Sequence, residues 1–378
     1  MIFYRNGSHA HAAVRPITAP APTVMFGARS NKVDWVDGAS VWRVTPEEAA
    51  TFQSYPCAFQ LRGTRTSQFL QVGNAVPPIV AKSVLHHLWK GDHHMTDYSH
   101  HTVLDLFSGH GVGVAIRQLG AKEYAVDNSK DVNQTRIANG MPPVHYEDVW
   151  DVHRAEGLDF DTLWGSPVCP TFSAAGKGSG RKQMPLILDA VADKTWLDID
   201  ALREWSDSLE DVRSGLTLVP LHYIHRFRPT FVALEQVKEV VPIWEAYAVE
   251  LESLGYSVWT GKITSEMYGV PQTRLRAYLI ARNDGKEAKP PTPTHSRYHM
   301  RSPEKLDEGV LPWVSMAQAL SATPPSEYPM TRPAPTVTGG GVSTGGWEPF
   351  GPGGRKAILS SLSATTAPAE TPRIAAVA

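Results

Sequence analysis

The residue with the clearest chemical potential is Cys169, one of two cysteines in a chain of 378 residues. It stands in the run Gly165-Ser166-Pro167-Val168-Cys169-Pro170, directly after the apolar pair Leu163-Trp164. An arbitrary cysteine is most often a small buried hydrophobe. A thiol held by prolines at the end of an apolar strand is instead placed to act as a nucleophile on a rigid turn. The other cysteine, Cys57, lies far away, so the sequence predicts neither a disulfide framework nor a metal site.

Two further segments carry groups that could act on a bound base. Glu235 follows the apolar run Phe231 to Leu234, so burial could raise its pKa and make it a proton donor. Taken alone, such an acid is more often a cap. Gln272, Arg274 and Arg276 alternate along an extended segment and therefore share one face. Two guanidiniums there suit the phosphate and base of a nucleotide, or else salt bridges within the site.

A glycine-rich turn predicts a ligand site at a helix N-terminus. The strand that contains Asp105 runs into Ser108-Gly109-His110-Gly111-Val112-Gly113, where small residues let the backbone approach a ligand. Asp127 ends the next apolar run, about twenty residues on, where a carboxylate can accept both ribose hydroxyls. Asp148 follows a further candidate strand and could accept an adenine amino group. Nicotinamide enzymes use a similar turn, but the residues Asp105 to Gly109 favour S-adenosylmethionine.

The elements that must position these groups alternate from Thr102 to Ala281. Apolar runs of strand length alternate there with helical patterns, which predicts a doubly wound α/β core on a parallel sheet. Its site is expected at the carboxyl ends of the strands. Strands are expected at 102–107, 124–127, 162–165, 230–235, 257–264 and 277–281, and helices near 111–119, 132–139, 216–227 and 244–254. Beyond Arg282 the residues are rich in Pro, Gly, Thr and Ser, typical of a loop-rich domain with one short helix over 313–320.

Charge and hydropathy limit the class of protein. The net charge of the whole chain is -2. Residues 1–91 carry nine Lys/Arg against four Asp/Glu, a local net charge of +5. That basic segment is compatible with phosphate contacts, and nearly as well with a solvated basic face. No apolar run approaches the roughly 20 residues of a membrane helix, and no secretory signal is visible. We therefore expect a monomer in the cytoplasm of a bacterial or phage-infected cell, without membrane contact.

In this order the motifs resemble those of the DNA cytosine-5 methyltransferase family, over nearly the whole chain. The resemblance implies methyl transfer from S-adenosylmethionine to a flipped cytosine of double-stranded DNA, through a covalent bond from Cys169. Glu235 and the element Gln272/Arg274/Arg276 resemble the other catalytic motifs of that family. The sequence departs from the family pattern at Val168 and Pro170, usually Pro and Gln, and at Gln236, usually Asn.

The resemblance also implies a cofactor site on a Rossmann-like methyltransferase core. Its expected members come from the glycine-rich turn, the two following strand ends, the cysteine loop and a Gly73-Asn74-Ala75-Val76-Pro77-Pro78 motif that resembles the family's closing element. They are Asp105, Phe107, Ser108, Gly109, Gly111, Gly113, Asp127, Asn128, Asp148, Val149, Pro167, Asn74, Ala75 and Val76.

The order of the motifs is the main departure, because elements that usually end this family stand before the cofactor loop. Such a circular permutation is physically cheap if the helix Ile79 to Trp89 already packs beside the first strand. The predicted units are 1–18 as part of a target-recognition domain, 19–90 as closing motifs on the core, 91–101 as a linker, 102–284 as the catalytic domain, 285–356 as the rest of the target-recognition domain, and 357–378 as a disordered tail.

Three alternatives stay open at this point. The same catalytic family includes a branch that acts on tRNA cytosine, and a catalytically silent DNA-binding regulator could keep the scaffold. A nicotinamide dehydrogenase could share the glycine turn, although it would not need the Cys169 and Arg274 segments. Base contacts are expected from loop residues such as Arg297, Tyr298, Arg332 and Trp347.

Overall fold

The computed structural model describes residues 1–6, 14–23, 32–37, 40–90, 97–168 and 179–321. Within these ranges the larger sheet has six strands in the order β10-β12-β9-β8-β6-β7. Their bounds are β6 (Thr102–Leu106), β7 (Lys122–Val126), β8 (Thr162–Gly165), β9 (Phe231–Val237), β10 (Ser257–Thr264) and β12 (Leu275–Arg282). Each strand predicted in the core is therefore present, with ends shifted by a few residues.

Strand direction departs from the prediction at one edge of this sheet. Strands β7, β6, β8 and β9 are parallel, as expected. Strand β12 runs antiparallel to both β9 and β10, so the parallel direction expected from the alternation of strands and helices does not extend to β12. The reason is the short connection after β10, because a parallel return needs a crossover of about a dozen residues or more.

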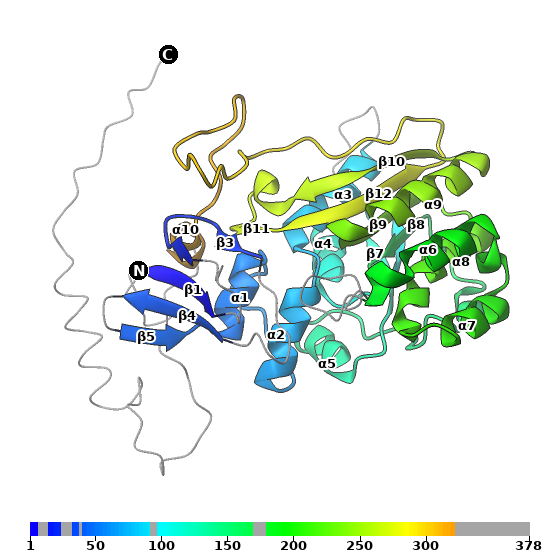
Figure 1. Ribbon diagram of the computed structural model, residues 1–378, viewed down its shortest axis with the longest axis horizontal. Coiled ribbons are helices and arrows are strands. Elements are labelled where there is room, and N and C mark those ends of the chain that lie inside the picture. Colours follow the sequence, from blue (N-terminus) through cyan, green and yellow to red (C-terminus); the bar gives the residue numbers. More distant parts are fainter. Residues whose placement is uncertain (7–13, 24–31, 38–39, 91–96, 169–178, 322–378) are drawn as a thin grey trace, which may run out of the picture.

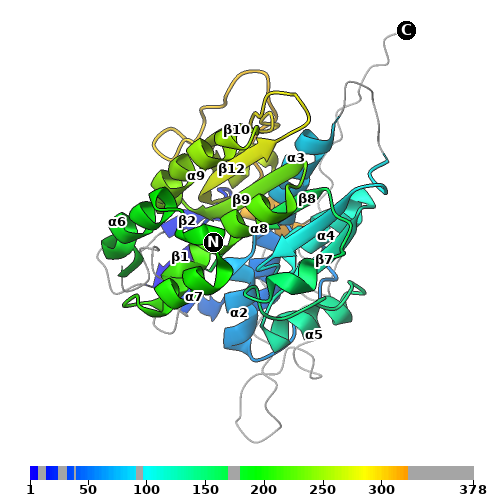
Figure 2. The ribbon, with the colours of Figure 1, turned by 90° about the vertical axis from the view of Figure 1, so that its right-hand side faces the viewer.

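Helices cover both faces of the large sheet, which gives the doubly wound α/β architecture (Figure 2). One face packs on α3 (Pro78–Trp89) and α4 (Gly111–Leu119), and the other on α6 (Ser179–Ala192), α8 (Val219–Phe227) and α9 (Val241–Ser253). Alternate residues of β9 show the two sides, since Phe231 and Ala233 join the first core whereas Val232 and Leu234 join the second.

Several helical details differ from the expected pattern. The helix predicted over 216–227 is a 3₁₀ turn at Val212–Leu218 followed by α8, whose first turn contains Pro220. Proline has no backbone N–H to donate, and that loss costs nothing in the first turn of a helix. Helix α5 (Lys130–Ala138) and helix α10 (Met316–Ser321) lie close to their predicted positions. Helices α6 and α7 (Ile199–Asp207) were not predicted.

The N-terminal part forms a smaller unit that the sequence did not reveal. Its sheet has the order β2-β1-β4-β5, with β1 (Ile2–Asn6), β2 (Val14–Pro16), β4 (Lys32–Asp37) and β5 (Ser40–Arg43). Helices α1 (Pro46–Phe52) and α2 (Arg65–Asn74) lie between this sheet and the large one (Figure 1). The small sheet takes strands from both sides of residue 18, where a domain boundary was predicted.

Segments from the two ends of the described chain meet at the large domain. Strand β3 (Ala21–Pro22) pairs in parallel with β11 (Gln272–Thr273), just before β12. The Met316 N–H of α10 donates to the Ala19 carbonyl at 3.0 Å. Most of the predicted linker 91–101 and the predicted tail 357–378 lie outside the described residues, although Tyr98 and His101 are buried. Within the described ranges, no helix has the length and apolar character to cross a bilayer.

Candidate active site

The predicted site residues gather where neighbouring strands of the large sheet end. Strand β6 leads into the glycine-rich loop 107–113, β7 into Asp127 and β8 into Pro167. Glu235 lies near the carboxyl end of β9. These four strands are parallel neighbours, so their carboxyl ends share one edge of the sheet. That edge is the position at which α/β sheets of this kind bind ligands.

The glycine-rich loop is held in a left-handed turn directly after β6. Phe107 has a φ of 56° and Gly109 a φ of 50°. The Gly109 N–H donates to Asp127 Oδ2 at 2.9 Å, and the Ser129 N–H donates to Asp127 Oδ1 at 2.8 Å. Burial raises the pKa of Asp127, although these two backbone hydrogen bonds oppose the shift. Asp127 thus fixes the loop, and its remaining lone pairs stay free for the predicted ribose contact.

Buried polar groups beneath this loop have unused hydrogen-bonding capacity. Asp105 is fully buried, and no N–H or O–H group of the described residues donates to its carboxyl oxygens, although a proton on one acid would bridge Asp105 and Glu123. Burial, together with the nearby Glu123 carboxylate, holds the pKa of Asp105 well above its ordinary range. The Ser108 hydroxyl is also buried without a partner in that part of the chain. Such orphaned groups are expensive in a closed core and common at a ligand site.

Arg136 is a site residue that the sequence did not indicate. Its fully buried guanidinium reaches from α5 to the Gly109 carbonyl at 3.1 Å and the Pro142 carbonyl at 3.1 Å. It also pairs with Glu123 Oε2 at 2.7 Å. The arginine therefore fixes the loop backbone from below. The sequence does not predict this role, because most arginines in helices are exposed to solvent.

The closing motif before the core packs directly on the glycine-rich loop. A Cβ at Gly111 would collide with the Val76 carbonyl, so only glycine permits this approach. Next to it, the Tyr55 hydroxyl and His110 Nδ1 lie 2.6 Å apart. Burial lowers the pKa of His110 to about 3, so the imidazole is neutral. Ala75 and Val76 are buried here, whereas Asn74 at the end of α2 is exposed.

The predicted proton donor is paired with one of the predicted arginines. Glu235 is only 4% exposed, and its Oε1 lies 3.3 Å from Arg276 Nε. Burial raises the pKa of Glu235, while Arg276 and Arg274 oppose the shift. A carboxyl group with a raised pKa and one cationic partner suits a general acid.

Gln272 and Arg274 bind backbone carbonyls of the N-terminal part. The Arg274 Nη1 donates to the Gly73 carbonyl at 2.8 Å, and the Gln272 Nε2 donates to the Phe52 carbonyl at 3.3 Å. Burial, followed by the charge of Arg276, lowers the pKa of Arg274 to about 9. Arg274 Nε has no partner among the described residues, so the guanidinium keeps one donor for a ligand.

The loop that leads to Cys169 is tied to the end of β9. Gln236 Nε2 donates to the Pro167 carbonyl, and Gln236 Oε1 accepts from the Val237 N–H at 2.6 Å. Pro167 precedes Cys169 by two residues. Cys169 itself lies outside the described residues, as do the candidate base contacts Arg332 and Trp347.

The remaining candidates stand at the edge beyond β7. A parallel bridge between Val126 and Tyr146 places Asp148 and Val149 beside the segment that holds Asn128. Asp148 Oδ1 accepts from the Trp150 N–H at 3.0 Å, and the Val149 carbonyl accepts from the Tyr223 hydroxyl at 2.9 Å. Asn128 is exposed. Asn128, Asp148 and Val149 therefore lie next to the carboxyl end of β7.

Comparison with a protein-family model identifies the family of this chain. The model for C-5 cytosine-specific DNA methylase matches residues 5–90 and 205–321, more than half of the chain. The chain belongs to the C-5 cytosine-specific DNA methylase family. Both the closing motif and the Gln272/Arg274/Arg276 element of this methylase lie in the matched ranges.

Individual relatives of this methylase are distant or short matches. It is 22% identical over 195 residues to the Type II methyltransferase M.AquIA of Picosynechococcus sp., covering 48% of this chain and 67% of that protein. It is 55% identical over 42 residues to the Type II methyltransferase M.AplI of Arthrospira platensis, covering 11% of this chain and 12% of that protein. The chain thus spans only a small part of M.AplI and about two thirds of M.AquIA.

Solved structures of similar proteins are also only partly covered. A putative DNA modification methyltransferase from an E. coli prophage matches 58% of this chain and 54% of its own, at 18% identity and a TM-score of 0.37. The Dnmt2 methyltransferase of S. pombe matches 50% of this chain and 52% of its own, at 18% identity and a TM-score of 0.36.

Proposed function

We propose that this chain methylates carbon 5 of a cytosine in double-stranded DNA, with S-adenosylmethionine as methyl donor and Cys169 as nucleophile. The observation that carries the proposal is the buried pair of Glu235 and Arg276 at the sheet edge. The next residue of β9, Gln236, donates to the carbonyl of Pro167, which follows the neighbouring strand β8 and stands two residues before the cysteine. Membership of the cytosine-5 methylase family supports the same reaction.

The residues around the glycine-rich loop fit S-adenosylmethionine. A Cβ at Gly109 would meet nothing within 4 Å, so the loop backbone is open to a ligand. The partnerless Ser108 hydroxyl and the spare lone pairs of Asp127 match a ligand with amine and hydroxyl donors, and Asp105 lies buried beneath them. We propose that these residues, with Phe107 and the Asn74-Ala75-Val76 segment, hold the cofactor. When bound, S-adenosylmethionine supplies the methyl group that carbon 5 accepts.

The proposed chemistry begins at Cys169, because carbon 5 of cytosine is a poor nucleophile within the aromatic ring. The thiolate adds to carbon 6, and the new sulfur–carbon bond pushes an electron pair towards N3. A free cysteine has a pKa of about 8.5, so the proposed reaction needs a positively charged surrounding that favours the thiolate. The electron pair returns through carbon 5 to form the bond to the methyl group. Transfer of the carbon 5 proton to solvent water then restores the 5,6 double bond and expels the Cys169 thiolate.

Glu235 is proposed to receive the charge that this addition creates. Burial raises its pKa, the direction that favours donating or sharing a proton at N3 of the ring. The Arg276 Nε beside Oε1 holds the carboxyl group in place. The target cytosine must leave the duplex to reach these groups, at a cost of a few kcal/mol.

Trapping with 5-fluorocytosine tests the proposal directly. Duplex DNA with this base should form a denaturant-resistant protein–DNA adduct, since the fluorine at carbon 5 cannot leave as a proton does. Cys169→Ser should form none, whereas Cys57→Ser, the matched control at an exposed thiol, should trap like the wild type. Equal trapping by Cys169→Ser would remove Cys169 from the mechanism. Cofactor binding without turnover on any DNA would instead favour a silent DNA-binding regulator.

The nucleic-acid class needs a separate measurement. Bisulfite sequencing of a plasmid from cells that express the protein should reveal methylated cytosines in a fixed sequence context. The same assay on tRNA should show none. The reverse outcome would assign the chain to RNA and overturn the proposal for DNA.

A further inference from the structure

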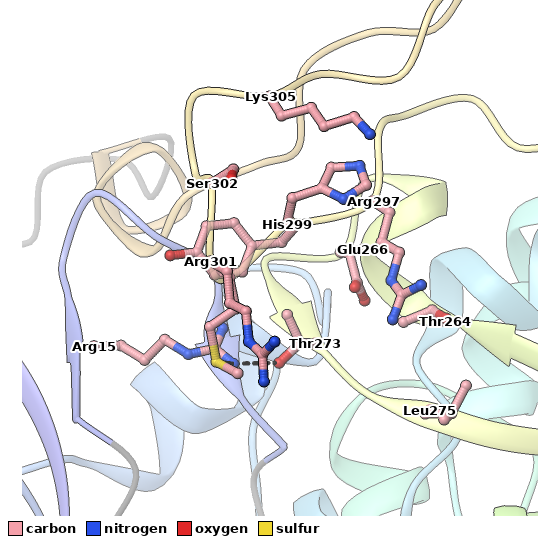
Figure 3. Close-up of a pocket in the computed structure, with 12 residues that line it drawn as sticks. Arg15, Thr264, Glu266, Thr273, Leu275, Arg297, His299, Arg301, Ser302 and Lys305 are labelled. Carbon is pink, nitrogen blue, oxygen red and sulfur yellow. Dashed lines mark hydrogen bonds between the residues drawn. The ribbon is translucent and has the colours of Figure 1, made fainter.

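A second site-like hollow lies outside the arrangement described so far. It is a cleft of about 510 Å³ between the loop of residues 297–305, the segment 264–275 and Arg15 of β2. We call it the basic cleft. Figure 3 shows Arg15, Arg297, Arg301 and Lys305 around it, with Glu266 and Thr273 on its inner side.

Three of the cations are exposed and come from one loop. Arg297, Arg301 and Lys305 all lie on the segment 297–305, and within the described residues none has an acidic partner within 4 Å. Long flexible cations without local partners are free to follow a charged ligand. A cluster of this kind raises the local concentration of anions.

Arg15 differs from the loop cations because it is fixed. Its Nη1 donates to the Pro20 carbonyl at 3.1 Å and its Nη2 donates to the Thr273 hydroxyl at 3.1 Å. The guanidinium lies 5.0 Å from the centre of the Tyr298 ring. These contacts hold the Arg15 guanidinium in one position, where it connects β2, the segment before β12 and the loop.

Acids of the same loop do not line the cleft, although Asp307 is hydrogen-bonded to two residues that do. Asp307 accepts from His299 Nε2 at 2.9 Å and from the Arg297 N–H at 2.8 Å, and neither it nor Glu304 or Glu308 lines the cleft. The one acid that does is Glu266, which is 2% exposed and has an Oε2 without a partner among the described residues. Four cations therefore face one buried carboxyl group, which gives an excess of positive charge.

The basic cleft shares a segment with the candidate active site. Thr273 and Leu275 line the cleft, whereas the intervening Arg274 and Arg276 lie with Glu235. Alternate residues of an extended segment point to opposite sides. A ligand in the cleft would therefore lie across this segment from Arg274 and Arg276, with one extended strand between the cleft and Glu235.

We propose that the basic cleft binds the phosphate backbone of the DNA, with Arg297, Arg301 and Lys305 as exposed phosphate contacts and Arg15 as the fixed one. This inference rests on the proposed function, because it takes DNA as the polyanion. Phosphate contacts position a duplex and act equally on every sequence. The cleft therefore sets the affinity and orientation of DNA, while other residues choose the target.

The test measures binding of a fluorescent duplex by anisotropy over a range of salt concentrations. Loss of two phosphate contacts in R301Q/K305Q should lower the slope of log K against log salt by about 2 and weaken binding at 0.1 M salt roughly tenfold or more. The matched control is K90Q/K122Q, two exposed lysines at the opposite edge of the sheet, which should bind like the wild type. R297Q provides a second variant with an expected slope change of about 1.

The outcomes separate this inference from the proposed reaction. C169S should keep the DNA affinity and lose 5-fluorocytosine capture, whereas R301Q/K305Q should lose affinity and need more DNA for half-maximal capture. Equal affinity and slope in R301Q/K305Q and the control would overturn the cleft assignment and leave the reaction intact. Absence of capture in the wild type, with the affinity loss still present, would overturn the reaction alone. Deoxynucleoside monophosphates that bind the wild type but not R301Q/K305Q, with unchanged duplex affinity, would assign the cleft to a free nucleotide and overturn the assignment to the DNA backbone.

Discussion

At the scale of single residues, the contact between Gly111 and Val76 joins the closing motif to the cofactor loop. The Val76 carbonyl occupies the space that any side chain at Gly111 would need. A carbonyl oxygen belongs to the backbone and cannot rotate away as a side chain does. The segment between α2 and α3 can therefore approach the loop this closely only because Gly111 has no Cβ atom.

Gly111→Ala should weaken both folding and cofactor binding. Overpacking of this kind costs typically 1–3 kcal/mol, and here the strain falls on the loop proposed to hold S-adenosylmethionine. Urea denaturation should show the loss of stability, and calorimetry a weaker cofactor affinity. Gln118→Ala, at an exposed position of the same helix, is the control and should stay within about 0.5 kcal/mol of the wild type. Unchanged cofactor affinity in Gly111→Ala would remove the contact from the cofactor site.

The same scale shows what the sequence could and could not predict about the site. Asp105, Asp127 and Glu235 each lie at or near the end of an apolar run, so their common edge followed from strand geometry. Arg136 was missed because its three partners, Gly109, Pro142 and Glu123, come together only in the folded chain. The Val76 carbonyl was missed for a simpler reason, since every residue has a carbonyl group.

At the scale of elements, the first turn of α1 contains a carboxyl group in an unusual state. Glu48 forms a capping box with Thr45, whose N–H donates to Glu48 Oε2 at 2.8 Å. The Trp35 Nε1 donates to the same oxygen at 3.3 Å. Burial raises the pKa of Glu48 to about 7, so the folded helix favours the protonated form.

Stability should therefore fall as pH rises through the range set by Glu48. An acid whose pKa is higher in the folded state stabilises fully below its unfolded pKa of about 4.5, and progressively less up to about 7. The loss at full ionisation is on the order of 3 kcal/mol. Urea denaturation at pH 5 and pH 8 should show a smaller difference for Glu48→Gln than for the wild type. Glu47→Gln, at the exposed neighbouring position, should leave the difference unchanged, and equal differences in all three proteins would exclude Glu48 as the cause.

Elements were predictable where their own residues carried a period. The core strands appear as apolar runs, and α4 and α9 lie where the helical pattern placed them. The direction of β12 depends on the length of its connection to β10 and not on its residues. The small sheet was missed because its strands are short, β2 having only three residues, and are held together by pairing between distant segments.

At the scale of the whole molecule, we propose that the chain is a circular permutation of the usual family order. The closing motif reaches both halves of the site, since Val76 packs on Gly111 while the Gly73 carbonyl accepts from Arg274. A segment in this position can precede or follow the core with the same contacts. The predicted target-recognition domain would then combine N-terminal strands with residues after 285, as the Arg15 and Tyr298 contact and the pairing of α10 with Ala19 suggest.

DNA affinity should decrease as pH rises through the pKa of Glu266 in the basic cleft. Burial raises this pKa to about 7, opposed by the charges of Arg297 and Arg15 and by a backbone hydrogen bond from Tyr298. Ionisation adds a negative charge to a cleft that otherwise attracts phosphate. Anisotropy from pH 6 to pH 8 should show weaker binding at the higher pH. Glu266→Gln should flatten this dependence, and His299→Gln distinguishes the imidazole that also lines the cleft. A dependence retained in Glu266→Gln would contradict the role of Glu266.

The position of α3 early in the chain affects how the protein is made. Val80, Val84 and Leu88 of this helix share a hydrophobic core with residues of α4 and of β6, β8, β9 and β12, all of which the ribosome produces later. At 5–20 residues per second, the last of these strands emerges roughly 10 to 40 s after the helix. During that interval the apolar side of the helix lacks the strands that complete its core, so the nascent chain should bind ribosome-associated chaperones more strongly than a relative whose equivalent helix is synthesised last.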